Sequence, residues 1–255
     1  METRKLKVDL HLHTGEDPLD SIKYNAEQLI DNAHKMGFDV ISITNHHIVT
    51  YNEQLAEYAG DKGILLIPGI ELSIDNKHIL IINGDKSCSR IKTFEDLRRQ
   101  KDKDSLIIAP HPFFPGYASL NSKLCEHFDI FNGIEYSYFH SRGINFNKKA
   151  IRKAREYSLP LIGTSDTHRL WQLGRTFSII EADKSVESVI NAIKRHQVEV
   201  VTAPLGLGHM LKIGLRLLSD LNCNAIKSFF PSFVSDLRKQ MHIPEAIHIR
   251  RNRFH

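Results

Sequence analysis

Two histidines stand one residue apart in the segment KVDLHLHT, at the end of a run with the apolar alternation of a β-strand. Side chains of a strand alternate between its two faces. One face is therefore expected to carry Asp9, His11 and His13. The other face is expected to carry the apolar residues Val8, Leu10 and Leu12. Two imidazoles on one face can meet at one metal ion, since imidazole is the commonest metal ligand.

Further histidines and acids stand at or near the ends of later predicted strands: His46, Glu71, His78, His111, Asp166 and His168. In a barrel of parallel strands, the C-terminal strand ends gather at one face, and different βα units contribute to one site. A lone histidine at a strand end usually has a structural role, but here the coincidence repeats. Imidazole and carboxylate without thiolate suit Zn²⁺, Mn²⁺ or Fe²⁺. The sequence therefore predicts a site for several metal ions.

The elements that must position these side chains alternate between strand-like and helix-like patterns over about the first 200 residues. This alternation is typical of βα units around a largely parallel sheet. Strands are predicted near 6–13, 38–44, 64–72, 78–83, 105–110, 130–136, 159–164 and 176–180. Helices are predicted near 25–36, 51–61, 92–102, 119–126, 145–157 and 185–196.

Bulk composition fits one large domain, or one domain with an appendage, since 41% of the 255 residues are hydrophobic and 25% are charged. No run of about 18 apolar residues occurs, and METRKLKVDL lacks the apolar region of a signal peptide. We expect a cytoplasmic protein with no membrane segment. The three cysteines form no CxxC pair, which favours reduced thiols.

A boundary is predicted near residue 203, where the alternation stops. It divides a domain over 1–203 from a basic C-terminal extension over 204–255, which carries eight Lys or Arg against three Asp or Glu. Helical spacing of Leu, Ile and Met favours a helical extension that packs on the domain. The alternative is a basic surface for nucleic acid or another partner.

The stretches HLHT, ITNHH, PGIE, APHP and GTSDTH, in this order, resemble the PHP family, named for polymerase and histidinol phosphatase. The resemblance covers about residues 6–180. It implies an α/β fold, a distorted (β/α)7 barrel that holds two or three divalent metal ions (Mn²⁺, Zn²⁺ or Fe²⁺). It also implies hydrolysis of a phosphate ester by a metal-activated hydroxide.

The resemblance implies three groups of metal ligands. One metal would take His11, His13, Glu71 and Asp166, with Glu71 bridging to a second metal. The second would also take His111 and His78. A third would lie between His46, His168 and a loop acid, for which Asp20 is favoured and Asp17 is also within reach. His140 is the candidate for a histidine that some members place after the sixth strand.

The catalytic roles follow from the same resemblance. Glu71 would set the metal separation, and Asp166 or His140 would move the proton. Arg169 is a candidate phosphate clamp, because a guanidinium presents a planar fork to phosphate oxygens. The loop arginines Arg142 and Arg175 are its alternatives.

Two residues add detail to this picture. Asn45 stands where the family usually has an acid, and we interpret it as an outer-shell change that lowers negative charge near the third metal. Glu135, in GIE, either supports a ligand histidine or pairs with a cation.

The favoured function is a free-standing phosphoesterase for a nucleotide, an oligonucleotide or another small phosphomonoester. One alternative is a metal-binding regulatory module that has lost catalysis. Another is a metal-dependent amidohydrolase, although no predicted strand end offers the lysine that such enzymes often use. The basic extension leaves a nucleic-acid substrate open. The oligomeric state is left open too.

Overall fold

Nine strands form one mixed sheet in the computed structural model, which describes residues 3–101, 104–206 and 208–209. The strands are β1 (Arg4–Leu12), β2 (Val40–Ile43), β3 (Leu65–Ile74), β4 (Lys77–Ile82), β5 (Leu106–Ala109), β6 (Gly133–Ser137), β7 (Leu161–Thr164), β8 (Thr176–Ala182) and β9 (Val198–Thr202). Their spatial order is β7-β6-β5-β4-β3-β2-β1-β8-β9. The predicted extension over 204–255 falls almost entirely outside the described residues.

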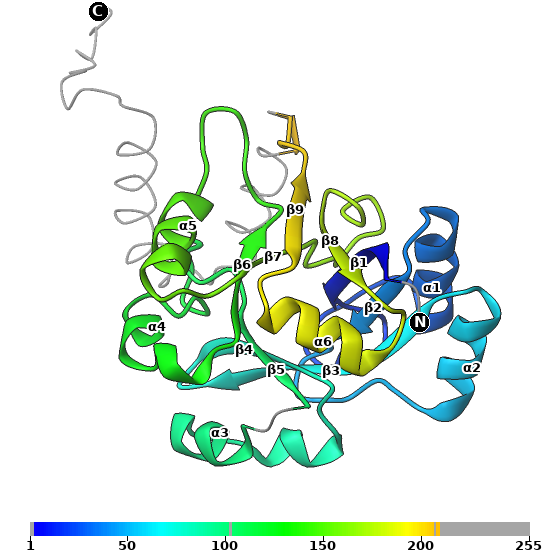
Figure 1. Ribbon diagram of the computed structural model, residues 1–255, viewed down its shortest axis with the longest axis horizontal. Coiled ribbons are helices and arrows are strands. Elements are labelled where there is room, and N and C mark those ends of the chain that lie inside the picture. Colours follow the sequence, from blue (N-terminus) through cyan, green and yellow to red (C-terminus); the bar gives the residue numbers. More distant parts are fainter. Residues whose placement is uncertain (1–2, 102–103, 207, 210–255) are drawn as a thin grey trace, which may run out of the picture.

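Among the described residues, six α-helices lie around the sheet (Figure 1). They are α1 (Ala26–Lys35), α2 (Glu53–Asp61), α3 (Phe94–Gln100), α4 (Ser122–Glu126), α5 (Asn147–Glu156) and α6 (Val186–Lys194). Each falls inside a predicted helical segment, and the ends follow local caps. Asn25 accepts a hydrogen bond from the backbone of Gln28 and completes a capping box before α1. Gly37, with φ +71°, follows that helix. In the described part of the chain, no helix is long and apolar enough to cross a membrane.

The sheet is less parallel than the sequence predicts. Strands β1, β2 and β3 are parallel, as are β5, β6 and β7. Strand β4, however, is antiparallel to both β3 and β5. It follows β3 through a tight hairpin at Asp75 and Asn76, whose φ values of 50° and 58° match a turn with two left-handed residues.

The last two strands form an antiparallel pair beside β1, in the order β1-β8-β9. Strand β9 was not expected, because its segment VEVVT is half-buried or exposed along its length and carries no strong apolar alternation. The expected count of seven βα units is therefore not confirmed, since β4, β8 and β9 pair in the antiparallel sense.

The two ends of the sheet meet and nearly close it into a barrel. Strand β7 contacts β8 and β9, and Thr167 after β7 pairs with Leu12 of β1. Gly163 in β7 exchanges hydrogen bonds with the Ser178 hydroxyl, at 2.9 and 3.0 Å. A Cβ on Gly163 would lie 2.5 Å from the carbonyl oxygen of Phe177. Only glycine lets these strands approach so closely.

An extra residue in β1 changes which side chains enter the barrel. Asp9 pairs with Ile41, and Leu12 pairs with Ile43, so three steps on β1 face two steps on β2. Such a β-bulge shifts the alternation by one residue and can re-aim a side chain.

The packing on the two sides of the bulge confirms the shift. Val8 and Leu10 pack in one core cluster with Leu80 of β4, inside the barrel. Leu12 packs outside the barrel wall with Leu29 of α1. The expectation that Val8, Leu10 and Leu12 share a face is therefore wrong. The expectation that Asp9 shares a face with His11 and His13 is wrong too. Val8 and Leu10 point into the barrel, so without the bulge the two histidines would have pointed outward together with Asp9.

Asp9 satisfies the backbone groups that the bulge frees. Its Oδ1 accepts the N–H of His11 at 3.3 Å and the N–H of Ser165 at 3.1 Å. The side chain is fully buried, and burial raises its pKa to about 7. Asp9 thus joins β1 to the segment after β7, directly behind the two histidines.

We expect Asp9→Ala to lower the free energy of unfolding by about 1–3 kcal/mol for each buried N–H that it leaves unpaired. Asp9→Asn keeps the Oδ1 acceptor and should lose much less. Urea unfolding of the two variants beside the wild type measures the difference. Equal losses in the alanine and asparagine variants would contradict this role for Oδ1.

Candidate metal centre

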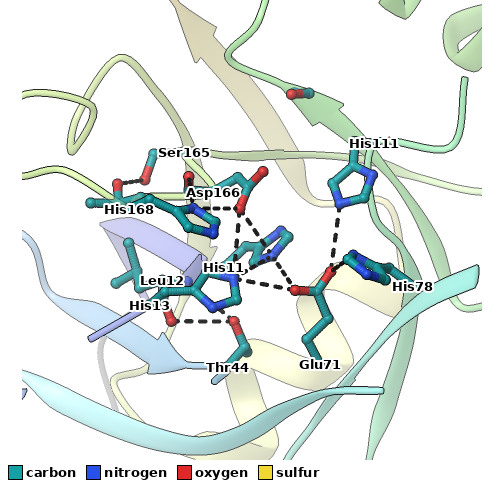
Figure 2. A network of polar contacts seen from close by, with 12 residues as sticks. His11, Leu12, His13, Thr44, Glu71, His78, His111, Ser165, Asp166 and His168 are labelled. Atoms are coloured by element: carbon teal, nitrogen blue, oxygen red, sulfur yellow. Dashed lines mark hydrogen bonds and ion pairs between the residues drawn. The ribbon is translucent and has the colours of Figure 1, made fainter. Parts of the chain in front are cut away.

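Imidazoles and carboxylates from β1, β3 and β4, and from the segments after β1, β2, β5 and β7, converge at one end of the barrel. Figure 2 shows the contacts around Glu71 and Asp166. The described residues contain five overlapping groups of donor atoms that lie within 4.8 Å of one another. The members are His11, His13, Asp17, Asp20, His46, Glu71, His78, His111, Asp166 and His168. The structure therefore brings together every predicted ligand except His140.

Glu71 lies at the centre of these groups. Its Oε2 is 3.4, 3.3 and 3.1 Å from the Nε2 atoms of, respectively, His11, His13 and His46. Its Oε1 is 2.9 Å from His78 Nδ1 and 3.5 Å from His111 Nε2. The two oxygens of one carboxylate thus face two separate sets of imidazoles, as a bridging ligand must.

The backbone fixes this position. Glu71 donates its N–H to the carbonyl of Asn45 at 3.2 Å and accepts the N–H of His47 at 2.9 Å. His46 between them therefore extends the β2–β3 pairing beyond the end of β2. The ladder holds Glu71 and the His46 imidazole on the same interior face.

The donor set fits divalent metal ions. Glu71 Oε1 and His78 Nδ1 are buried and only 2.9 Å apart, yet neither makes a hydrogen bond of acceptable geometry. His11 Nε2 and His13 Nε2 face each other at 3.1 Å, and Asp166 Oδ1 lies 3.4 and 3.6 Å from these two atoms. Buried polar atoms normally have partners. A shared cation would satisfy all of these donors at once.

Two carboxylates orient the imidazoles from behind. His11 Nδ1 donates to Glu135 Oε2 at 2.8 Å, so its Nε2 faces the centre. Asp17 Oδ2 accepts from His13 Nδ1 and from His46 Nδ1, both at 2.9 Å. Such outer partners fix the tautomer and the ring orientation of a ligand histidine. Glu135 thus contacts a histidine, one of the two roles predicted for it.

The two loop acids occupy different places. Asp17 is 6% exposed, and its oxygens are held by two imidazoles and by backbone N–H groups of the same loop. Asp20 has a side chain 37% exposed, with Oδ2 3.1 Å from His168 Nε2 and 3.4 Å from His46 Nδ1. Either acid could hold a metal by distance, but only Asp20 lies between the two histidines of the predicted third site.

His140 lies apart from the donor groups of the described residues. Its Nε2 is 2.7 Å from the hydroxyl of Thr202 in β9, and its carbonyl accepts the N–H of Leu205 at 2.7 Å. Burial lowers the pKa of this imidazole. Its contact with β9 could not be foreseen, because that strand was not predicted.

Asn45 has a structural set of contacts. Its Oδ1 accepts the N–H of Thr14 at 2.9 Å, and its Nδ2 donates to the hydroxyls of Thr14 and Thr50, both at 2.8 Å. The amide therefore ties the segment after β1 to the segment after β2. No contact of Asn45 with a candidate ligand side chain occurs among these bonds.

Two candidate ligands adopt backbone conformations that residues with a Cβ rarely take. His111 has φ 27° and Asp166 has φ 45°. Such conformations cost about 1–3 kcal/mol each and cluster at functional sites. The His111 carbonyl accepts a hydrogen bond from the Ser119 hydroxyl at 2.9 Å, which helps to hold the turn. Both side chains belong to one donor group with His11.

The buried charges hold one another in the ionised form. Burial opposes ionisation of Glu71, but the charges of His78 and His11 outweigh it and hold the pKa of Glu71 well below its usual value. Burial alone would lower the pKa of His11, yet Asp166 and Glu71 raise it well above its usual value. Asp166 likewise overcomes burial and raises the pKa of His168 to about 9. Without metal, the cluster therefore keeps protons at neutral pH.

A family model described as PHP-associated matches residues 145–198, from just before α5 to the start of β9. Over 163 residues the chain is 28% identical to the uncharacterized protein MJ1587 of Methanocaldococcus jannaschii, covering 58% of this chain and 91% of that protein. Over 83 residues it is 30% identical to the PolC-type DNA polymerase III of Caldanaerobacter subterraneus subsp. tengcongensis, covering 32% of this chain and 6% of that protein. The resemblance to the PHP family is confirmed.

The PHP-type fold is shared with endonuclease Q of Pyrococcus furiosus, described as a lesion-specific endonuclease. That structure superposes with a TM-score of 0.57 at 18% identity, covering 77% of this chain and 58% of that one. An endonuclease Q complex with a 27-mer duplex that carries an abasic lesion superposes with the same TM-score, covering 75% and 57%. At 18% identity, the similarity between this chain and endonuclease Q is a similarity of fold.

Sequence reasoning assigned no role to Asp9 and treated Asp17 only as a ligand candidate. The sequence places Asp9 on the strand of the two histidines. It does not reveal the bulge, and therefore does not reveal that Asp9 accepts the backbone N–H groups of His11 and Ser165. For Asp17, the spacing of four residues from His13 was the available signal. A carboxylate at that spacing can turn back onto the ring, and here it does.

Metal binding is expected to tighten as pH rises from neutral to about 9. A histidine binds metal only in its neutral form, so metal must displace protons from His11 and His168. The pKa of His168, raised to about 9, places the loss of its proton within this range. Calorimetric titration with Mn²⁺ in buffers of different ionisation enthalpy counts the protons released. An affinity independent of pH, with no proton release, would contradict the expectation.

We expect Glu135→Gln to weaken metal binding by about 10- to 100-fold, because the amide keeps the size but loses the charge that orients His11. Glu181→Gln, at an exposed position of β8, is the matched control and should bind metal like the wild type. Competition with a chelator measures both affinities. Equal affinities for the two variants would argue that Glu135 has no part in ligand orientation.

Proposed function

We propose that the chain is a metal-dependent hydrolase that cleaves a phosphate ester. The observation that carries the proposal is Glu71, a single carboxylate whose oxygens face two sets of imidazoles. Divalent ions at such a centre would supply positive charge that stabilises the attacking and leaving oxygens of an in-line displacement. The distances allow this carboxylate to set the separation of two ions.

The proposed ligand assignment follows the distances. The first site takes His11, His13, Glu71 and Asp166; the second takes Glu71, His78 and His111; the third takes His46, His168 and Asp20. In this assignment Asp17 is a positioning residue for His13 and His46. His140 stays a prediction as a ligand, and it would have to leave Thr202 to reach the centre.

Asp166 is the proposed group for proton movement. Its side chain is 20% exposed, while Oδ1 lies within 3.6 Å of the imidazoles of His11, His13 and His168. Although partial burial opposes ionisation, the charges of His11 and His168 hold the pKa of Asp166 below its usual value. Its carboxylate would therefore take a proton from these imidazoles only transiently and release it to solvent.

Arg169 is the proposed phosphate clamp. It directly follows His168, it is exposed, and its guanidinium forms no ion pair with any described residue. Of the alternatives, Arg175 contacts the Trp171 carbonyl at 3.5 Å. A free guanidinium beside a ligand histidine suits a phosphate that spans the metal centre and the adjacent loop.

The proposed substrate is a nucleotide or oligonucleotide. Similarity to a polymerase and the shared fold with a nuclease that is seen bound to duplex DNA both support this choice. The alternative hypothesis is a metal-binding module that has lost catalysis. Asn45 does not support it, because its amide donates hydrogen bonds to Thr14 and Thr50 rather than to a candidate metal ligand.

Glu71→Gln is expected to reduce hydrolysis of p-nitrophenyl phosphate by about 10²–10³-fold or more. It should also reduce the metal content, since the bridging charge is lost. Elemental analysis should find two or three transition-metal ions per wild-type chain. Glu181→Gln is the control, expected to keep both activity and metal. Wild-type turnover in Glu71→Gln would contradict the proposal, and so would a metal-loaded wild type that cleaves no phosphate ester.

A further inference from the structure

A cavity of about 530 Å³ opens beside the metal centre and begins at His168. Its walls come from the loop after Asp20, from the outward face of α1, and from the loop that joins β7 to β8. Volumes of this size are typical of small-ligand sites. Since His168 lines the cavity and also belongs to the donor groups, a substrate at the metal centre can extend into this space.

The cavity wall is positively charged. Lys23, Lys35 and Arg169 line it, and none of the three forms an ion pair within 4.0 Å with an acid among the described residues. Lys62 and, more weakly, the charge of Lys35 lower the pKa of Asp31, the acid on the same wall. Asp31 is 2.8 Å from Lys62 and accepts a hydrogen bond from Tyr58 at 2.9 Å. Its charge is therefore already balanced, and the three cations remain available to an anion.

An aromatic platform completes the wall. Trp171 is the one tryptophan of the sequence, and it lines the cavity at half burial. It packs against the cluster of Tyr138, Phe139, Phe146 and Leu205. An indole held by this cluster, and by the His209 ring whose centroid lies 4.8 Å away, is positioned before a ligand arrives, which lowers the entropy cost of binding.

We propose that this cavity binds the nucleotide unit next to the scissile phosphate. The base would stack on Trp171, and Lys23 and Lys35 would hold the phosphate of that unit. Arg169, next to His168, would reach the scissile phosphate. Stacking on an aromatic side chain tolerates any base, because every base has a π-face. This inference rests on the proposed function and narrows its substrate to nucleotides with a phosphate in addition to the scissile one.

Tryptophan fluorescence reports binding directly, because Trp171 is the one indole in the chain. Titration of the metal-loaded full chain with the dinucleotide pTpT should quench the emission to saturation. Inorganic phosphate should not. Lys23→Ala should weaken the quenching about tenfold, as expected for the loss of one charged hydrogen bond. Lys5→Ala, an exposed lysine at the opposite end of β1, is the matched control.

Kinetics test the same subsite through turnover. In Lys23→Ala and Lys35→Ala the KM for pTpT should rise about tenfold, while the KM for p-nitrophenyl phosphate should change much less. Both lysines are exposed, so these variants should fold. Trp171→Phe keeps an aromatic ring and should rescue most of the pTpT affinity that Trp171→Leu loses.

The two proposals fail in different ways. Absence of quenching by pTpT, or an equal rise in KM for both substrates, would overturn the nucleotide subsite even if p-nitrophenyl phosphate is cleaved. Saturable quenching that depends on Lys23, in a protein that cleaves no phosphate ester, would support the subsite and overturn the proposed function. Equal effects of Lys5→Ala and Lys23→Ala would reduce the binding to general electrostatic attraction and would count against the subsite.

Discussion

The extra residue in β1 is the constraint on which the metal centre depends. Leu6, Val8 and Leu10 need the interior of the barrel, because burying them stabilises the core. A strand without a bulge would then have pointed His11 and His13 outward. Because of the bulge, β1 places Leu6, Val8 and Leu10 in the barrel core and also points His11 and His13 into the barrel, at its mouth. Asp9 keeps that arrangement satisfied, since its carboxylate accepts the N–H of His11.

The charged groups of the metal centre stabilise one another in their ionised forms. A fully buried carboxylate such as Glu71 could not stay ionised alone, and it does so here because imidazoles surround both oxygens. The same imidazoles keep raised pKa values because carboxylates surround them. Divalent ions can take over the balancing role of the protons. A barrel mouth supplies this mutual arrangement because separate strands reach one point.

Recognition and chemistry share one structural element. The segment after β7 carries Asp166 and His168 toward the centre, and Arg169 and Trp171 toward the cavity. Its start is held by Asp9 behind β1 and by pairing with Leu12, so the segment that leads into the cavity wall is tied to the histidine strand. A substrate held in the cavity would therefore stand in fixed register with the metal centre.

The sequence by itself determined the residue types of the site and their places at strand ends, because spacing along a strand is a local property. It also determined most helices and strands, whose caps and apolar periods are local too. Tertiary structure alone decided the direction of β4, the existence of β9, and the bulge, since these depend on partners distant in the chain. It also separated Asp17 from Asp20, and placed His140 on Thr202, because a side chain's role depends on which other segments reach it.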